Sequence, residues 1–184
     1  MDELSLYILD ITMNSVRAGA DKVTVSLYES DSVLRFSVQD NGCGMTEEQL
    51  ARLRDPFFTT RKTRKVGLGI PFLTMLAEMT DGHVTVTSVH ESQSTEHGTA
   101  ITAEFGKNHI DCLPLGDIVG TYTTLIQGSP DIAFTFIHET PNGTVRLCTE
   151  ELREILGDIS LAEPEILIWI EQHLHEQYNE INYK

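Results

Sequence analysis

The first apolar positions of the chain recur at helical spacing. These positions are Leu4, Ile8 and Ile11, which share one face of a helix, and Ser15 continues the same spacing. An amphipathic helix is therefore expected over residues 3–17, because Ala18-Gly19-Ala20-Asp21 ends the pattern. Asp10 and Asn14 are four residues apart, so their side chains share one face of this helix, beside the apolar stripe.

A β-hairpin is expected next, because apolar and polar residues begin to alternate. Its strands cover residues 23–27 and 34–38, and the polar residues 29–32 form its turn. The alternation continues to Asp40, which predicts that this carboxylate points to the core side of the second strand. The chain then breaks at Asn41-Gly42-Cys43-Gly44.

The pattern predicts four more elements before Gly106. They are helices over residues 46–53 and 69–80 and strands over residues 83–88 and 99–105. Thr46 is the expected N-cap of the first helix, and Pro71 lies in the first turn of the second. Grouped helices and mainly antiparallel strands predict an α+β fold, a two-layer sandwich of one helical layer on one sheet.

Residues 109–184 are expected to form a small C-terminal α+β extension to a first domain of residues 1–108. Its expected elements are a helix over 116–127, a hairpin of strands 132–137 and 144–148 around Pro141-Asn142-Gly143, and helices over 149–156 and 163–179. Trp169, with Ile166, Leu167 and Ile170, is expected to pack the last helix onto the domain, and the alternative is a stripe that faces a partner.

Charge is distributed unevenly along the chain. The formal net charge is −15, which disfavours nonspecific binding to nucleic acid or to an anionic membrane. Residues 109–184 hold 13 acids and three bases. Six bases gather between Arg52 and Lys65, so an otherwise acidic chain has one compact basic segment. Taken alone, this segment is equally typical of a solvated loop.

The expected location is the cytoplasm. No apolar run approaches the roughly 18 residues of a membrane span, and the acidic start Met1-Asp2-Glu3 is unlike a signal peptide. The three cysteines, Cys43, Cys112 and Cys148, are widely spaced and form no CxxC pair. This spacing argues against a disulfide framework and against a structural zinc site.

Asp40 and the glycines that follow it suit the recognition of adenine. A carboxylate accepts a hydrogen bond from the exocyclic amino group, and glycines let the backbone come close to a flat ring. The alternative is an Asx-type turn at the end of a strand. Gly67-Leu68-Gly69 precedes a helix, where free amides and the helix dipole attract an anion; the alternative is a plain loop-to-helix junction. Together with the basic segment, these glycines predict a phosphate-binding lid.

The motifs resemble, in order and spacing, those of the GHKL superfamily, which includes gyrase-type topoisomerases, large heat-shock chaperones, sensor histidine kinases and MutL-type mismatch-repair proteins. The resemblance covers residues 1–108. Its motifs are an N box at Asp10–Ala20 (DITMNSVRAGA), a first glycine box at Asp40–Met45 (DNGCGM), an F box at Phe57–Arg61 (FFTTR), a second glycine box at Gly67–Ile70 (GLGI) and a closing motif at Gly98-Thr99.

This resemblance implies a Bergerat-type ATP-binding fold with ATP and Mg²⁺ as cofactors. It implies that Asn14 binds Mg²⁺, that Asp40 holds the adenine and that Asp10 is the catalytic base. The other nucleotide-binding positions that it implies are Gly42, Gly44, Met45, Phe58, Arg61, Gly67, Leu68, Gly69 and Thr99, and the basic segment adds Lys62 and Lys65.

Three departures from the family pattern bear on activity. Asp10 stands where the hydrolytic members carry a glutamate, which shortens the reach of a base by one methylene. Lys65 replaces the leading glycine of the second glycine box and brings another cation toward the phosphates. Nothing precedes the N box, so the dimerisation helices and the phosphoacceptor histidine of a sensor kinase are expected to be missing.

Three functions follow as hypotheses. The first is a stand-alone ATPase or trans-acting protein kinase, with Asp10 as base and a protein as partner or substrate. The second is a non-catalytic module in which ATP changes how residues 109–184 bind a protein partner. The third is a relic of the family that binds no nucleotide.

Overall fold

The described strands form one six-stranded sheet in the order β3-β4-β2-β1-β5-β6. The structure is a computed structural model that describes residues 2–53 and 69–183. Neighbouring strands are antiparallel except β1 and β5, which are parallel. The strands are β1 (Lys22–Glu29), β2 (Val33–Asp40), β3 (His83–Val89), β4 (Gly98–Gly106), β5 (Ala133–Thr140) and β6 (Gly143–Cys148).

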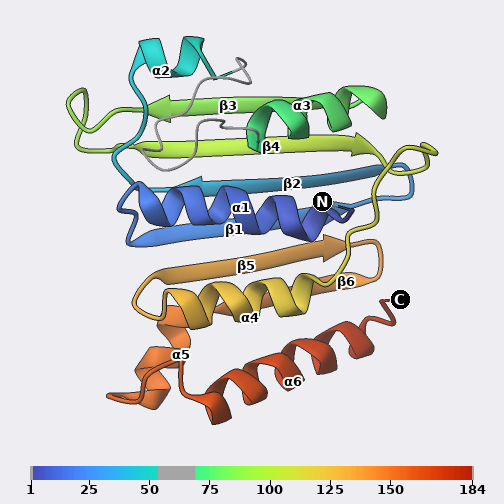
Figure 1. Cartoon of the computed structure of the whole chain (residues 1–184). Coiled ribbons are helices and arrows are strands. Elements are labelled where there is room, and N and C mark those ends of the chain that lie inside the picture. The colour runs from blue at the N-terminus through green and yellow to red at the C-terminus, as the bar shows by residue number, and fades with distance from the viewer. Residues whose placement is uncertain (1, 54–68, 184) are drawn as a thin grey trace.

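One face of this sheet carries the helical layer, with α1, α3 and α4 lying across it (Figure 1). The helices are α1 (Leu4–Arg17), α2 (Glu47–Ala51), α3 (Gly69–Met79), α4 (Ile118–Gly128), α5 (Thr149–Leu156) and α6 (Pro164–Glu180). Helix α6 packs against α4 and β6, which extends the layer to the edge of the sheet. The expected two-layer α+β fold is therefore confirmed.

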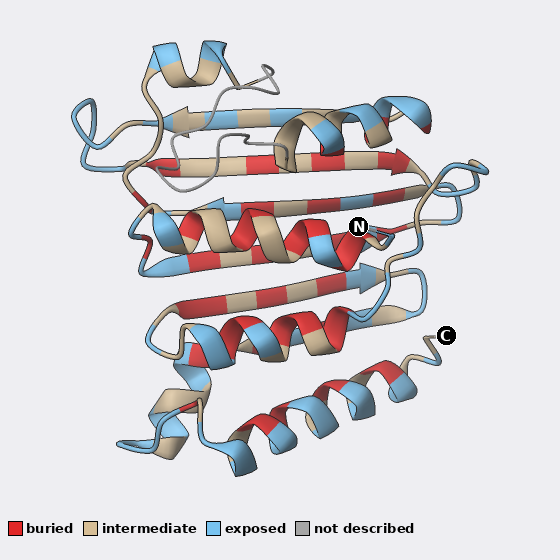
Figure 2. Cartoon of the chain, in the orientation of Figure 1, coloured by how far each residue is buried: buried red, intermediate tan, exposed pale blue. Residues whose placement is uncertain are grey.

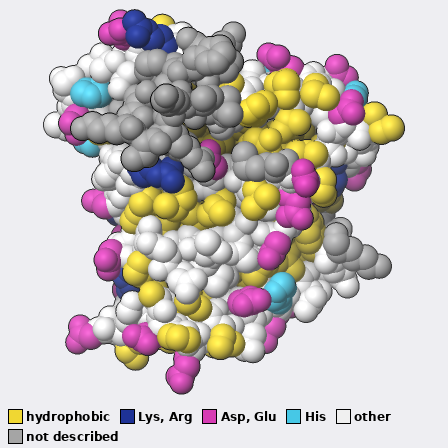
Figure 3. Space-filling view, in the orientation of Figure 1, with side chains coloured by type: hydrophobic (Ala, Val, Ile, Leu, Met, Phe, Trp, Pro, Cys, Tyr) yellow, Lys and Arg dark blue, Asp and Glu magenta, His cyan; other side chains and the backbone are white. Residues whose placement is uncertain are grey.

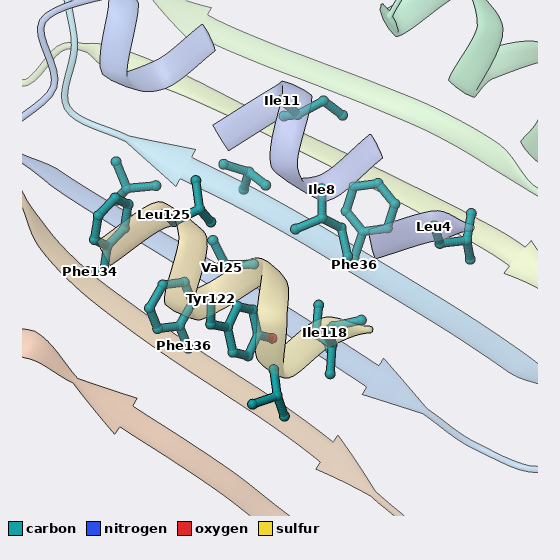
Figure 4. Close-up of a cluster of buried hydrophobic side chains, with 14 of the residues drawn as sticks. Leu4, Ile8, Ile11, Val25, Phe36, Ile118, Tyr122, Leu125, Phe134 and Phe136 are labelled. Carbon is teal, nitrogen blue, oxygen red and sulfur yellow. The ribbon is translucent and has the colours of Figure 1, made fainter. Parts of the chain in front are cut away.

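The core lies between this helical layer and the sheet. Burial alternates along the central strands, because every second side chain of a strand points to the covered face (Figure 2). Ile8 of α1 lies near Phe36 of β2, and Tyr122 of α4 stacks on Phe136 of β5 with ring centroids 4.1 Å apart (Figure 4). Fully burying one such side chain contributes about 1.5–3 kcal/mol. The core thus runs continuously from α1 to α4.

The C-terminal hairpin shares the sheet with the hairpin of β1 and β2. β5 pairs with β1 over all but the last residue of each strand, so that Val23 lies beside Phe134 and Val25 beside Phe136. The sequence predicted both strands of this hairpin but not their place in the sheet. A division of the chain near residue 108 stays a prediction, since strands on both sides of it are hydrogen-bonded neighbours.

The predicted packing of α6 is confirmed for Leu167 and Ile170, which are buried, and is wrong for Trp169. Its side chain is 48% exposed and stacks on His173, with ring centroids 4.9 Å apart. The buried stripe of α6 consists instead of Leu167, Ile170, Leu174 and Tyr178. These residues recur every three or four positions and therefore share one face of the helix. Trp169 belongs to the apolar run of residues 166–170 but lies on another face of the helix.

A buried polar cluster joins the end of β1 to the C-terminal region. Glu29 is 5% exposed and accepts hydrogen bonds from His138 (3.0 Å), Lys107 (2.6 Å) and Tyr183 (2.5 Å). Nδ1 of His138 lies 2.9 Å from the hydroxyl of Tyr178. Burial alone would raise the pKa of Glu29, but the hydrogen bonds from His138, Lys107 and Tyr183 outweigh it and lower this pKa to about 2.

Candidate functional site

Asp40 is the last residue of β2 and lies at one end of the central strands, where the end of α1, the end of β2 and the start of β4 meet (Figure 1). Its position on the core side of the strand is confirmed, in phase with the buried residues of β2. Oδ2 accepts a hydrogen bond from Ser15 Oγ (2.6 Å), and Oδ1 accepts from the backbone amides of Gly42 (2.9 Å) and Thr99 (3.2 Å). The hydrogen bond from Gly42 closes the expected Asx-type turn. The hydrogen bonds from Ser15 and Thr99 are additional and tie Asp40 to α1 and β4. Oδ2 keeps the capacity to accept from a further donor.

Close packing of the backbone explains the glycines after Asp40. A Cβ on Gly42 would lie 2.9 Å from the Cβ of Ala18 at the end of α1. Gly44 has φ +69°, and a Cβ there would overlap the carbonyl of Val89. At both glycines the backbone comes close to other parts of the protein. From the sequence alone, the expected close neighbour was the adenine ring. The glycines therefore let α1, β2 and β3 come together beside Asp40.

The side-chain hydroxyls of Ser88 and Thr99 lie where residues Gly42–Met45, the glycine segment, meet the sheet. The amide of Met45 donates to Ser88 Oγ (2.8 Å) at the end of β3. Ser88 Oγ also lies 2.8 Å from Thr99 Oγ1 and donates to the carbonyl of Gly98 (2.9 Å). Met45 and Thr99, both predicted site residues, are thus held by the same hydroxyl group.

Asp10 and Asn14 lie on the face of α1 that turns toward the start of α3. The rise of an α-helix places them about 6 Å apart along its axis. A Cβ on Gly69, the first residue of α3, would lie 2.6 Å from Asp10 Oδ2, so this carboxylate abuts the helix start. Asn14 Oδ1 accepts from Arg17 (3.1 Å). An amide oxygen is a ligand that Mg²⁺ accepts, so the side chain of Asn14 fits this ion.

The described part of the chain holds eight predicted site residues at or near this end of the central strands. They are Asp10, Asn14, Asp40, Gly42, Gly44, Met45, Gly69 and Thr99. The other predicted residues lie outside the described ranges: Phe58, Arg61, Lys62, Lys65, Gly67 and Leu68. Within residues 2–53 and 69–183, no cluster of three or more His, Cys, Asp or Glu residues could hold a metal ion. No helix in those ranges is long and apolar enough to cross a bilayer.

Sequence reasoning missed two side chains that contact the site. Ser15 continues the apolar stripe of α1, and the structure shows that its hydroxyl binds Asp40. Nδ1 of His97 lies 2.5 Å from the carbonyl of Gly42, a contact that no sequence motif predicts. The sequence signal for Ser15 is a polar residue on the buried face of a helix, which needs a hydrogen-bond partner in the core. The contact of His97 leaves no such signal, because it depends on how the loop before β4 folds.

Residues 2–109 match the model of the family described as histidine kinase-, DNA gyrase B- and HSP90-like ATPases. The chain is similar to sporulation kinase E of Bacillus subtilis, with 33% identity over 102 residues, which cover 53% of this chain and 14% of the kinase. It is also similar to the sensor protein kinase FleS of Pseudomonas aeruginosa, with 44% identity over 64 residues, which cover 34% of this chain and 16% of FleS. The matches thus span a small part of these relatives.

The fold is similar to that of the Aquifex aeolicus MutL ATPase domain complexed with ADP. The TM-score is 0.56 with 14% sequence identity, and the alignment covers 85% of this chain and 69% of that one. At this identity the likeness concerns the fold. It extends beyond the residues matched by the family model, since these are only residues 2–109.

Proposed function

Because the chain belongs to the family of histidine kinase-, DNA gyrase B- and HSP90-like ATPases, we propose that it binds ATP·Mg²⁺ at the end of the central strands, where α1, β2 and β4 meet. The observation that carries this proposal is the carboxylate of Asp40, fixed by Ser15, Gly42 and Thr99 and able to accept from one more donor. The amino group of adenine is such a donor. We place the protein in the cytoplasm, in keeping with its free cysteines.

The phosphates and the metal ion are assigned to the α1–α3 side of the site. Asn14 supplies an amide oxygen to Mg²⁺, and the amides at the start of α3 attract the terminal phosphates, aided by the helix dipole. The sequence adds Arg61, Lys62 and Lys65 as cations for the same phosphates. Bound Mg²⁺ would supply charge neutralisation of the β- and γ-phosphates.

The proposed activity is phosphoryl transfer, as a stand-alone ATPase or as a trans-acting protein kinase. Such transfer depends mainly on positioning and charge compensation. Asp10 is the proposed base, because its carboxylate lies against the first residue of α3. The relatives named as kinases favour a protein substrate over water.

A second candidate is an ATP-responsive module that binds a protein partner through residues 109–184. Helix α4 of this region packs against α1, the helix that carries Asp10 and Asn14, so a change at the site has a direct packed route to the extension. Acidic side chains are scattered over the lower part of the view in Figure 3, which the C-terminal elements occupy. Its partner would therefore be basic.

Substitution of Asp40 tests the binding site. Asp40→Asn replaces an acceptor-only group by one that can present a donor to the adenine amino group, so we expect ATP affinity to fall at least about tenfold, or about 1.4 kcal/mol. Asp31→Asn is the matched control, because Asp31 is exposed in the turn between β1 and β2. Isothermal titration calorimetry with ATP·Mg²⁺ measures both. Equal affinities of the Asp40→Asn variant and the wild type would refute the assignment.

Two further measurements separate the enzyme from the module. Phosphate release by the wild type that equals release by Asp10→Ala would reject Asp10 as the base. For the module, ATP·Mg²⁺ should slow amide hydrogen exchange in α4 without turnover. Identical exchange in α4 with and without nucleotide would rule out transmission to the extension.

A further inference from the structure

The loop of residues 90–97, between β3 and β4, holds two consecutive carbonyls of the glycine segment. The amide of Glu91 donates to the carbonyl of Cys43 (2.9 Å). Nδ1 of His97 lies 2.5 Å from the carbonyl of Gly42. A carbonyl only accepts, so Nδ1 of His97 carries the proton and donates. The loop thus binds the carbonyls of the glycine segment. On the α1 side of the segment, the amide of Cys43 donates to the carbonyl of Ala18 (2.9 Å).

Gly42 needs these contacts because of its own chemistry. A side chain does not fit beside Ala18, yet a residue without Cβ has wide freedom in both backbone dihedrals. Its amide is fixed by the hydrogen bond to Asp40 Oδ1 (2.9 Å). Its carbonyl is fixed by His97. The peptide group before Gly42 is thus held by Asp40, and the one after it by His97 at its carbonyl and by Ala18 at the amide of Cys43. Loss of His97 leaves this second peptide group with one of its two hydrogen bonds, so that its direction is less firmly set.

We propose that His97 is a positioning residue of the nucleotide site, which fixes the Gly42–Cys43 peptide and, through the amide of Gly42, the direction of the Asp40 carboxylate. This inference rests on the proposed binding of ATP at Asp40. His97 acts on the adenine end of the site, because Asp10, Asn14 and Gly69 lie on the other side, between α1 and α3. Its loss should therefore affect ATP and ADP equally.

The test compares four variants by calorimetric titration with ATP and with ADP and by thermal unfolding without nucleotide. His97→Ala should weaken both nucleotides by the same factor, about three- to tenfold, as expected for one hydrogen bond. His97→Asn carries an amide nitrogen the same number of bonds from Cα as Nδ1 and should restore affinity to within about twofold. His97→Gln moves that nitrogen one bond further out and should remain weak.

His90→Ala is the matched control in the same loop. Nδ1 of His90 lies 2.9 Å from Ser92 Oγ within the loop, so this variant should bind ATP as the wild type does. Wild-type affinity in His97→Ala would overturn the role of His97. Equal weakness of His97→Asn and His97→Gln would also overturn it, and this comparison holds even if His97→Ala does not fold. A wild type that binds no ATP would instead overturn the proposed function, and the inference with it.

Discussion

Replacing Glu29 by glutamine tests how much the buried polar cluster contributes to stability. The substitution keeps the shape of the side chain and removes its charge. The oxygen of the new amide can still accept from His138 or Tyr183, but its nitrogen would face a donor at Lys107. We therefore expect Glu29→Gln to lower the free energy of unfolding at pH 7.

The pKa of Glu29 sets the size of this loss. A fall from 4.5 to about 2 corresponds to at most about 3.4 kcal/mol, at about 1.36 kcal/mol for each pH unit. The side chain of Lys107 is 37% exposed, so screening reduces its share and the expected loss is about 2–3 kcal/mol. Because the pKa is lower in the folded state, this stabilisation is complete above about pH 4.5 and is lost as the pH falls toward 2.

Urea unfolding followed by circular dichroism, at several pH values between 7 and 3.5, measures the difference between wild type and variant. The difference should shrink by about 1 kcal/mol between pH 4.5 and 3.5, because the unfolded-state carboxyl is itself partly protonated in this range. Glu151→Gln is the matched control, since Glu151 also binds a cation, with Arg146 at 2.7 and 3.0 Å, but its side chain is 58% exposed. Its loss should be much smaller.

Two outcomes would refute this reasoning. One is a loss at pH 7 for Glu29→Gln that is no larger than the loss for Glu151→Gln. The other is a difference between wild type and Glu29→Gln that stays constant from pH 5.5 to 3.5. Either result would mean that the charge of Glu29 is not what stabilises the cluster.

Three other predictions concern the core, the glycine segment and catalysis. The hydroxyl of Tyr122 is buried without a partner among the described residues, so Tyr122→Phe should stabilise by up to about 1 kcal/mol, while Tyr178→Phe should destabilise by about as much in the same urea assay. Gly44→Ala should cost more than about 2 kcal/mol and lower ATP affinity, whereas Gly128→Ala, which has open space, should be tolerated in thermal unfolding. Asp10→Asn should cut phosphate release at least about a hundredfold without changing ATP affinity by calorimetry, and unchanged release would reject the base.

The local elements could be predicted because each one leaves a local pattern. The stripe of Leu4, Ile8 and Ile11 defines α1, and alternation defines β2 as far as Asp40. Thr46 is the N-cap of α2 as expected, and it forms a capping box with Gln49. These signals depend on residues within a few positions of one another.

The order of the strands in the sheet and the hydrogen-bond partners of the buried polar residues leave no such local pattern. Nothing near residues 22–29 indicates that β1 lies beside β5, because that contact joins distant segments of the chain. Glu29 and His138 each look like an ordinary polar strand residue, and only the fold brings them to hydrogen-bonding distance. For the site, the motifs predicted which residues gather around Asp40, while the contacts of Ser15 and His97 required the structure.

The parallel pairing of β1 with β5 has a consequence for synthesis of the chain. β5 is made about 110 residues after β1, and at about 5–20 residues per second the ribosome needs about 5–20 s to supply it. During this interval the amides and carbonyls along one side of β1 have no strand to bond, beside the apolar residues Val23, Val25 and Leu27. An open apolar edge of this kind can pair with another chain. The nascent protein is therefore more exposed to aggregation than the finished one, and slow translation of the C-terminal region should lower the yield of folded protein.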